Sequence, residues 1–260
     1  MSARGGLIPF LIVCYAFLYL PIVFLIWFSF NDSRSVTAWA GFSLRWYRVL
    51  SHDQAMLGAA LLSLRIAAVS ASIALLVGTA SGLALARFGR FRGRTVFEAA
   101  LFAPLILPEV ITGLSLLLLF VLAERFTGWP SGRGAGTVTI AHASVSVAYV
   151  AVVVRARLAD LGTAPEEAAA DLYAPPWNVF VAVTVPLLMP ALVAGWLLAF
   201  TLSLDDVVVA SFTSGPGATT LPMLVFSATR LGVTPEIYAL ATVIVVGVGA
   251  VLAVVAWGRR

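Results

Sequence analysis

Long apolar runs separated by short polar segments dominate this sequence. Each run is close to the roughly 20 residues that an α-helix needs to cross the hydrocarbon core of a bilayer. Backbone polar groups in a bilayer must be satisfied within the chain, which favours helices over irregular segments. We therefore predict an all-α integral membrane protein with about six transmembrane helices. The predicted spans are residues 7–30, 57–86, 97–123, 137–154, 186–212 and 237–257.

Proline and glycine residues modify this pattern within two of the runs. Pro104 and Pro108 lie inside the third run, so we expect a single span that is kinked about a third of the way across. Residues 214–217, Ser-Gly-Pro-Gly, are expected to end the fifth span. Residues 221–231 are then expected to form a short surface helix before the sixth span.

The composition is that of a membrane protein. Of the 260 residues, 61% are hydrophobic and 11% are charged, whereas a typical soluble domain has about 25% charged residues. The formal net charge of +4 could indicate nucleic-acid binding, but the arginines gather at the ends of apolar runs, as membrane-topology signals do. We therefore expect no nucleic-acid partner and treat residues 1–260 as a single transmembrane domain.

The distribution of arginines predicts an orientation in the membrane. Arg87, Arg90, Arg92 and Arg94 crowd one short loop, and short cytoplasmic loops are the ones that accumulate positive residues. We therefore expect this loop, both chain termini and the polar segment 155–185 to be cytoplasmic.

The polar segment 155–185 places a cluster of charged residues between two apolar spans. Thr163 and Glu166 have the spacing of a capping box, which predicts the start of a short helix. The proline pair at 175–176 is expected to end that helix. A second short amphipathic run, residues 177–183, then leads into the fifth span.

Enzymatic chemistry is not visible in the sequence. A phosphate-binding G-x-x-x-x-G-K-[ST] loop requires a lysine, and all 16 Lys and Arg residues are arginine. His52 and His142 have no partner at metal-ligand spacing, and we interpret them as structural or surface residues. The single cysteine, Cys14, excludes an intrachain disulfide. We predict no catalytic residue, metal site or cofactor in this chain.

The polar segment resembles the EAA loop in the permeases of binding-protein-dependent ABC importers. The family pattern is E-A-A-x-D-L-G-A, a spacer with an aromatic residue, L-P-x-x-x-P and a later glycine. Tyr173 stands where the family usually has glycine, and a left-handed turn there costs a non-glycine residue about 1 kcal/mol. The residues at the corresponding positions, with Glu166 before them, are Glu167, Ala168, Ala169, Asp171, Leu172, Tyr173, Ala174, Phe180, Pro186, Pro190 and Gly195.

This resemblance implies a type I ABC importer permease (MetI-like) fold in a bacterial inner membrane. In such permeases the loop forms a coupling helix that sits in a groove of the cytoplasmic ATPase. The resemblance further implies a second permease subunit, an ABC ATPase dimer and a periplasmic solute-binding protein as partners. ATP and Mg²⁺ would then be bound by the ATPase, this chain would not be an enzyme, and transport would proceed by alternating access.

The region after the loop is similar to the second permease subunit of spermidine/putrescine importers. The similarity lies in Asp205-Asp206 and in the Gly-Pro-Gly-x-x-Thr-Leu-Pro run at 215–222, and it implies a polyamine as the solute. A charged residue near the middle of a span costs about 2.5–3.5 kcal/mol on insertion scales. We therefore expect Glu109, Asp205 and Asp206 to line the substrate path. The alternative is that Asp205 or Asp206 packs or gates helices, for example paired with Arg65.

Three other functions remain open from the sequence. An importer of the same family for another small solute, such as an opine or an amino-acid derivative, shares parts of the pattern. The chain could instead be an ion-coupled secondary transporter, but such a transporter has no ATPase for the segment around Glu167 to contact. A membrane-embedded enzyme is disfavoured, because no catalytic grouping is visible.

Overall fold

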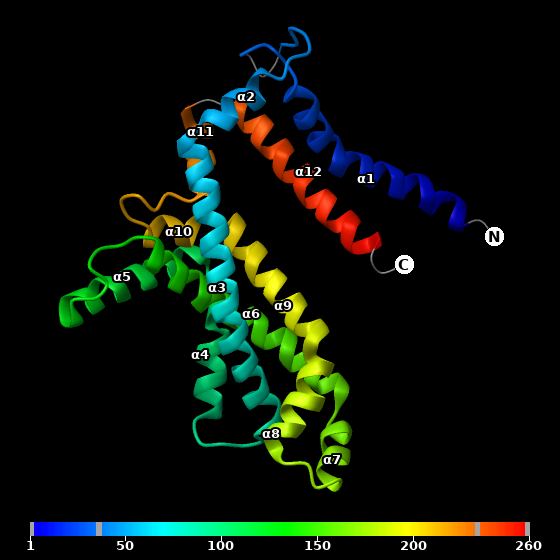
Figure 1. Cartoon of the computed structure of the whole chain (residues 1–260), viewed down its shortest axis with the longest axis vertical. Helices are drawn as coiled ribbons and strands as arrows, with labels where there is room; N and C mark the ends of the chain where they lie inside the picture. The colour runs from blue at the N-terminus through cyan, green and yellow to red at the C-terminus, as the bar shows by residue number, and fades with distance from the viewer. Residues whose placement is uncertain (1–2, 35–37, 232–234, 258–260) are drawn as a thin grey trace. The chain divides into compact units, whose positions relative to one another are not determined.

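The computed structural model describes the backbone of residues 3–34, 38–231 and 235–257, and the side chains of residues 8–34, 38–230 and 235–247. The described residues are predominantly helical (Figure 1), which confirms the predicted all-α class. The helices are α1 (Ala3–Phe28), α2 (Arg45–His52), α3 (Gln54–Arg87), α4 (Arg94–Ile106), α5 (Glu109–Thr127), α6 (Ala135–Leu161), α7 (Ala164–Asp171), α8 (Pro176–Val179), α9 (Val185–Asp205), α10 (Val208–Thr213), α11 (Leu221–Leu231) and α12 (Pro235–Trp257), with a π-helical segment at Phe180–Thr184.

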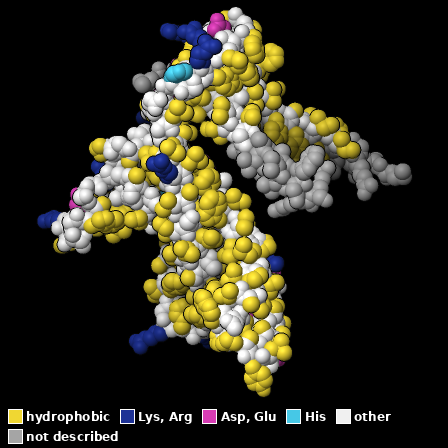
Figure 2. Space-filling model, in the orientation of Figure 1, with side chains coloured by type: hydrophobic (Ala, Val, Ile, Leu, Met, Phe, Trp, Pro, Cys, Tyr) yellow, Lys and Arg dark blue, Asp and Glu magenta, His cyan; other side chains and the backbone are white. Residues whose placement is uncertain are grey.

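Five helical stretches of the described chain are long and apolar enough to cross a membrane. They lie in α1, α3, α5, α6 and the continuous stretch Pro176–Asp205. A further helix, α12, has 23 residues, but its side chains from residue 248 onward lie outside the described part. Hydrophobic side chains, yellow in Figure 2, are spread over the visible faces of the helices, as expected for surfaces that meet lipid rather than water.

The chain divides into two compact units, residues 1–58 with 224–260, and residues 59–223. In the first unit α12 packs against α1 and α2. The link between α1 and α2 folds around the buried Asn31, whose amide nitrogen donates to the carbonyl of Ala38 at 2.7 Å. Trp46 is buried and donates its indole N–H to the Asn31 carbonyl at 2.7 Å.

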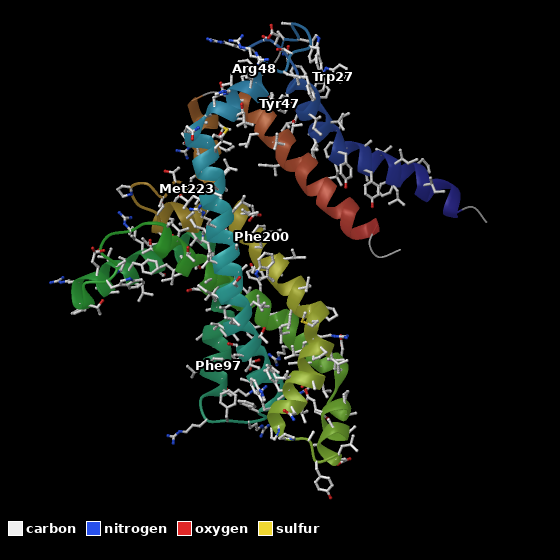
Figure 3. The ribbon with its side chains drawn as sticks, viewed as in Figure 1. Trp27, Tyr47, Arg48, Phe97, Phe200 and Met223 are labelled. Atoms are coloured by element: carbon white, nitrogen blue, oxygen red, sulfur yellow. The ribbon has the colours of Figure 1, made fainter. Side chains whose placement is uncertain are left out.

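The core of the second unit lies where α3, α6 and α9 cross. Val150 and Val154 of α6 and Leu188 of α9 are fully buried there, and Phe200 of α9, labelled in Figure 3, packs against the same cluster. Gly78 of α3 allows the close approach, because a Cβ at that position would lie 2.7 Å from the Cβ of Val150. Small residues of this kind are typical of helix contacts in membranes. Helix association there depends on close van der Waals packing, because the surrounding lipid is as apolar as the side chains.

The third predicted span consists of two helices rather than one kinked helix. Leu107, with φ −76° and ψ 140°, is extended and separates α4 from α5. Pro108 explains the break, because it lacks an N–H and its ring excludes helical angles for the preceding residue. Pro104, by contrast, lies within α4. Glu109 is therefore the first residue of a helix, where the helix dipole favours a carboxylate.

The fifth predicted span ends earlier than expected. Asp206, with φ −70° and ψ 125°, is extended, so the helix stops at Asp205 and not at residues 214–217. The Asp206 carboxylate accepts the N–H groups of Val209 at 3.1 Å and Ala210 at 2.8 Å. Short acidic side chains readily bond nearby backbone N–H groups in this way, which competes with helix continuation and starts a new helix, α10.

The polar segment 155–185 is more helical than predicted. The preceding helix, α6, continues to Leu161, and α8 runs through the π-helical segment into α9 without interruption. Pro186, the predicted first residue of the fifth span, and Pro190 both lie within a helical stretch that begins earlier, at Pro176. The wider π turn before Pro186 accommodates a residue that cannot donate a regular backbone hydrogen bond. The only part of this segment between α6 and α8 is α7 with the short turns on either side of it. In Figure 1, α7 lies at one end of this unit.

Candidate functional site

Glu166, in the first turn of α7, binds the ends of two other helices. Its Oε2 accepts a hydrogen bond from Arg87 Nε at 2.8 Å, and its Oε1 accepts one from Thr184 Oγ1 at 2.9 Å. Arg87 is the last residue of α3, and Thr184 immediately precedes α9. One carboxylate therefore ties α7 to α3 and to the start of α9.

The predicted capping box does not form. Thr163 is the N-cap of α7, as expected, but its side chain makes no capping hydrogen bond. The Glu166 side chain turns to Arg87 instead, because charge-assisted hydrogen bonds are roughly twice as strong as neutral ones. The backbone still starts the helix at the predicted place, since the N–H groups of Glu166 and Glu167 both donate to the Thr163 carbonyl at 3.0 Å.

Arg87 also caps the end of α6. Its Nη2 donates to the carbonyl of Gly162 at 2.7 Å, and its Nη1 donates to the carbonyl of Leu158 at 3.4 Å. Carbonyls at a helix C-terminus lack intrahelical partners and carry the negative end of the helix dipole, so a cation is favoured there. Arg87 was predicted only as a topology signal, but its contacts make it part of the α7 site.

The two faces of α7 differ in their surroundings. The inner face lines a cavity of about 450 Å³ with residues of α3 and α8, and its members from the α7 segment are Glu166, Ala170 and Ala174. The outer residues of the motif, Glu167, Ala168 and Asp171, are exposed. Ala169 is half-buried in the middle of the helix. The outer face thus presents two carboxylates that are open to a partner.

The end of α7 is a Schellman turn around Tyr173, which has φ 57°. The N–H of Tyr173 donates to the carbonyl of Ala170 at 2.9 Å, and the N–H of Ala174 donates to that of Ala169 at 3.3 Å. Tyr173 thus adopts the left-handed conformation that the family's glycine would adopt. Its side chain is 97% exposed and that of Leu172 is 82% exposed, so the turn projects two large apolar groups away from the chain.

The three carboxylates predicted on the substrate path line one cavity of about 340 Å³ in the second unit. Glu109 comes from the start of α5, Asp205 from the end of α9 and Asp206 from the break before α10. The unpredicted helix breaks at Leu107 and Asp206 therefore place these side chains together. The remaining lining residues are His142, Val145, Ser146, Tyr149, Leu202, Ser203, Val207, Val208 and Val209.

His142, which was interpreted from the sequence as a structural or surface residue, lines the cavity. It is buried, with 4% of its surface exposed. Its Nε2 lies 2.8 Å from Asp206 Oδ2, in an electrostatic contact rather than a well-directed hydrogen bond. Its Nδ1 lies 2.6 Å from Ser203 Oγ. The alternative partner for Asp206, Arg65, is exposed on α3. The available signal was that an ionisable residue inside an apolar run is usually functional.

Membrane-spanning helices around an acidic cavity, with a short exposed helix between two of the spans, define a solute permease. Residues 74–259 match the family described as binding-protein-dependent transport system inner membrane component. The chain belongs to this family and is a multi-pass inner-membrane protein of a transport system.

Two relatives from Escherichia coli (strain K12) align with nearly the whole chain. The putrescine transport system permease protein PotI is 55% identical over 250 residues, which cover 96% of this chain and 89% of the relative. The spermidine/putrescine transport system permease protein PotC is 40% identical over 243 residues, which cover 94% of this chain and 88% of the relative.

Two solved structures share the fold at low sequence identity. A bacterial ABC transporter involved in the import of the acidic polysaccharide alginate has a TM-score of 0.73 and 18% identity, over 98% of this chain and 95% of that chain. An amino acid ABC transporter has a TM-score of 0.58 and 18% identity, over 84% of this chain and 100% of that chain. These similarities confirm the predicted ABC importer permease fold.

Proposed function

We propose that this chain is the permease subunit of an ATP-driven ABC importer that moves a polyamine, putrescine or spermidine, into the cytoplasm by alternating access. The observation that carries the solute assignment is the convergence of Glu109, Asp205 and Asp206 on one cavity. The names of the two relatives, at 55% and 40% identity, support the same solute class.

The chemistry of the cavity suits a flexible organic cation. Glu109 and Asp205 have no ion-pair partner within the described part of the chain, so they are available to the ammonium groups of a solute. Such contacts would offset the cost of desolvating the amine and the carboxylates. Val145 and Leu202 offer apolar surface to a methylene chain, and Tyr149 adds to the lining an aromatic side chain of the kind that binds cations.

The exposed face of α7 supports a docking role toward a partner ATPase. Glu167 and Asp171 present carboxylates for basic groups, and Leu172 and Tyr173 present apolar surface that a groove would cover. The partners we propose are a cytoplasmic ABC ATPase dimer that binds ATP and Mg²⁺, a second permease subunit and a periplasmic solute-binding protein. In this arrangement α7, the Arg87 loop and both termini are cytoplasmic.

The solute assignment is tested by uptake of radiolabelled putrescine into proteoliposomes that hold the assembled importer. We expect Glu109→Gln and Asp205→Asn each to reduce kcat/KM about tenfold, because each removes one charge-assisted contact. Asp160→Asn, an exposed carboxylate at the end of α6, is the matched control and should transport normally. Normal uptake by both cavity variants would remove these carboxylates from the path.

The other candidate functions give different results in the same system. A same-family importer of another solute would transport an opine or an amino-acid derivative but no polyamine. An ion-coupled secondary transporter would take up solute without the ATPase and would respond to an ionophore. Loss of uptake when the ATPase is omitted therefore supports the ABC assignment.

A further inference from the structure

The three carboxylates of the cavity are not equivalent. Asp206 is already engaged through both oxygens: Oδ1 accepts the N–H of Val209, Oδ2 accepts the N–H of Ala210, and Oδ2 also lies 2.8 Å from His142 Nε2. Glu109 and Asp205 are exposed and take part in no ion pair among the described residues. The cavity therefore offers two open carboxylates and one that the protein itself occupies.

His142 is held at Asp206 by a chain of buried side chains. Ser203 Oγ lies 2.6 Å from the Nδ1 of His142 and accepts a hydrogen bond from Ser70 Oγ at 3.3 Å. These three side chains come from α6, α9 and α3, and none is more than 6% exposed. The buried imidazole therefore lies 2.8 Å from Asp206 at one ring nitrogen and 2.6 Å from Ser203 at the other, which fixes its position from both sides.

We propose that His142 sets the number of cationic centres that the cavity recognises, and thereby favours a diamine over a triamine. The proposal rests on the proposed polyamine function. The imidazole fills the position at Asp206 Oδ2 that a solute ammonium would otherwise take, whichever protonation state the ring has. Glu109 and Asp205 then remain for two ammonium groups, which is the number in putrescine, whereas spermidine carries a third.

The test compares two substitutions that differ in whether they leave Asp206 occupied. His142→Ala vacates the position, while His142→Gln retains an amide N–H that can reach Asp206. The readout is the ratio of kcat/KM for spermidine to kcat/KM for putrescine, measured in proteoliposomes with the chain's own partner subunits and one fixed binding protein. Because the binding protein is the same throughout, a change in the ratio reports on the permease.

We expect His142→Ala to raise the spermidine-to-putrescine ratio about tenfold, the effect of one additional charge-assisted contact. His142→Gln should stay within about twofold of the parent. His52→Ala, at the exposed second histidine on α2, is the matched control and should leave the ratio unchanged. An unchanged ratio in an active His142→Ala variant, or an equal shift in both His142 variants, would overturn the proposal.

A second variant decides the matter if His142→Ala fails to assemble. Ser203→Ala removes the partner of Nδ1 and loosens the imidazole, so it should shift the ratio in the same direction by about threefold. No shift in an active Ser203→Ala variant would then count against the proposal. If the parent complex transports neither amine, the proposed function itself fails. If it transports amines with a ratio that no variant changes, only the role of His142 fails.

Discussion

Arg87 Nε and Glu166 Oε2 lie 2.8 Å apart and join the end of α3 to the first turn of α7. Their side chains are 18% and 23% exposed, so solvent screens this pair less than an ion pair on an open surface. Because Glu166 also bonds Thr184 and Arg87 also bonds the end of α6, this pair connects α7 to the ends of three long helices.

Glu166→Gln should therefore weaken the mechanical link without removing the helix. We expect uptake to fall severalfold while the assembled complex still hydrolyses ATP, since a charge-assisted contact of this kind contributes about 1.5–3 kcal/mol. The comparison is Glu98→Gln, which breaks the Arg155–Glu98 pair between α6 and α4, where both side chains are more exposed, at 39% and 34%. Equal losses from both variants would contradict a special role for Glu166.

The helical state of α7 can be tested separately from its surface. Ala169→Pro places proline in the middle of an eight-residue helix, which costs about 3 kcal/mol and should unfold it. We expect normal membrane insertion but no transport. Glu167→Ala keeps the helix and removes an exposed carboxylate, and it should reduce capture of the ATPase in a pull-down. Retained transport in both variants would rule out α7 as the coupling element.

Tyr173 combines an unfavourable backbone conformation with an exposed ring, and two substitutions separate these properties. Tyr173→Gly should stabilise the protein by about 1 kcal/mol, because glycine adopts a positive φ without steric cost. Tyr173→Ala loses the same ring but keeps the strain, so it should show no such gain. Thermal unfolding in detergent measures the stability, and ATPase binding, which should fall equally in both variants, measures the loss of the ring.

The contact between α3 and α6 depends on the absence of a side chain at Gly78. Gly78→Ala would bring a Cβ to 2.7 Å from Val150 Cβ and 2.9 Å from the Val147 carbonyl, which should destabilise the protein by about 1–3 kcal/mol. Gly58→Ala, on the same helix but with nothing within 4 Å of the new Cβ, should be neutral or stabilising by up to about 1 kcal/mol. A thermal unfolding comparison of the two variants in detergent tests this difference.

The sequence by itself determined the class of the fold and singled out the residues of both candidate sites. Runs of about 20 apolar residues specify spanning helices because an unpaired backbone is too costly in lipid, and this effect is local to each run. The position of α7 is also set locally, because proline is favoured in the first turn of a helix and the alanines that follow have high helix propensity. The carboxylates at 109, 205 and 206 could be assigned to a cavity because charged residues within spans seldom face lipid.

Only the tertiary structure decided which partners these residues take. Whether Glu166 caps its own helix or binds Arg87, 79 positions away, depends on where α3 ends in space. The contact of His142 with Ser203, 61 positions away, likewise arises from the packing of α6 against α9. Such long-range contacts leave no periodic pattern in the sequence, and they convert separate motifs into two connected sites.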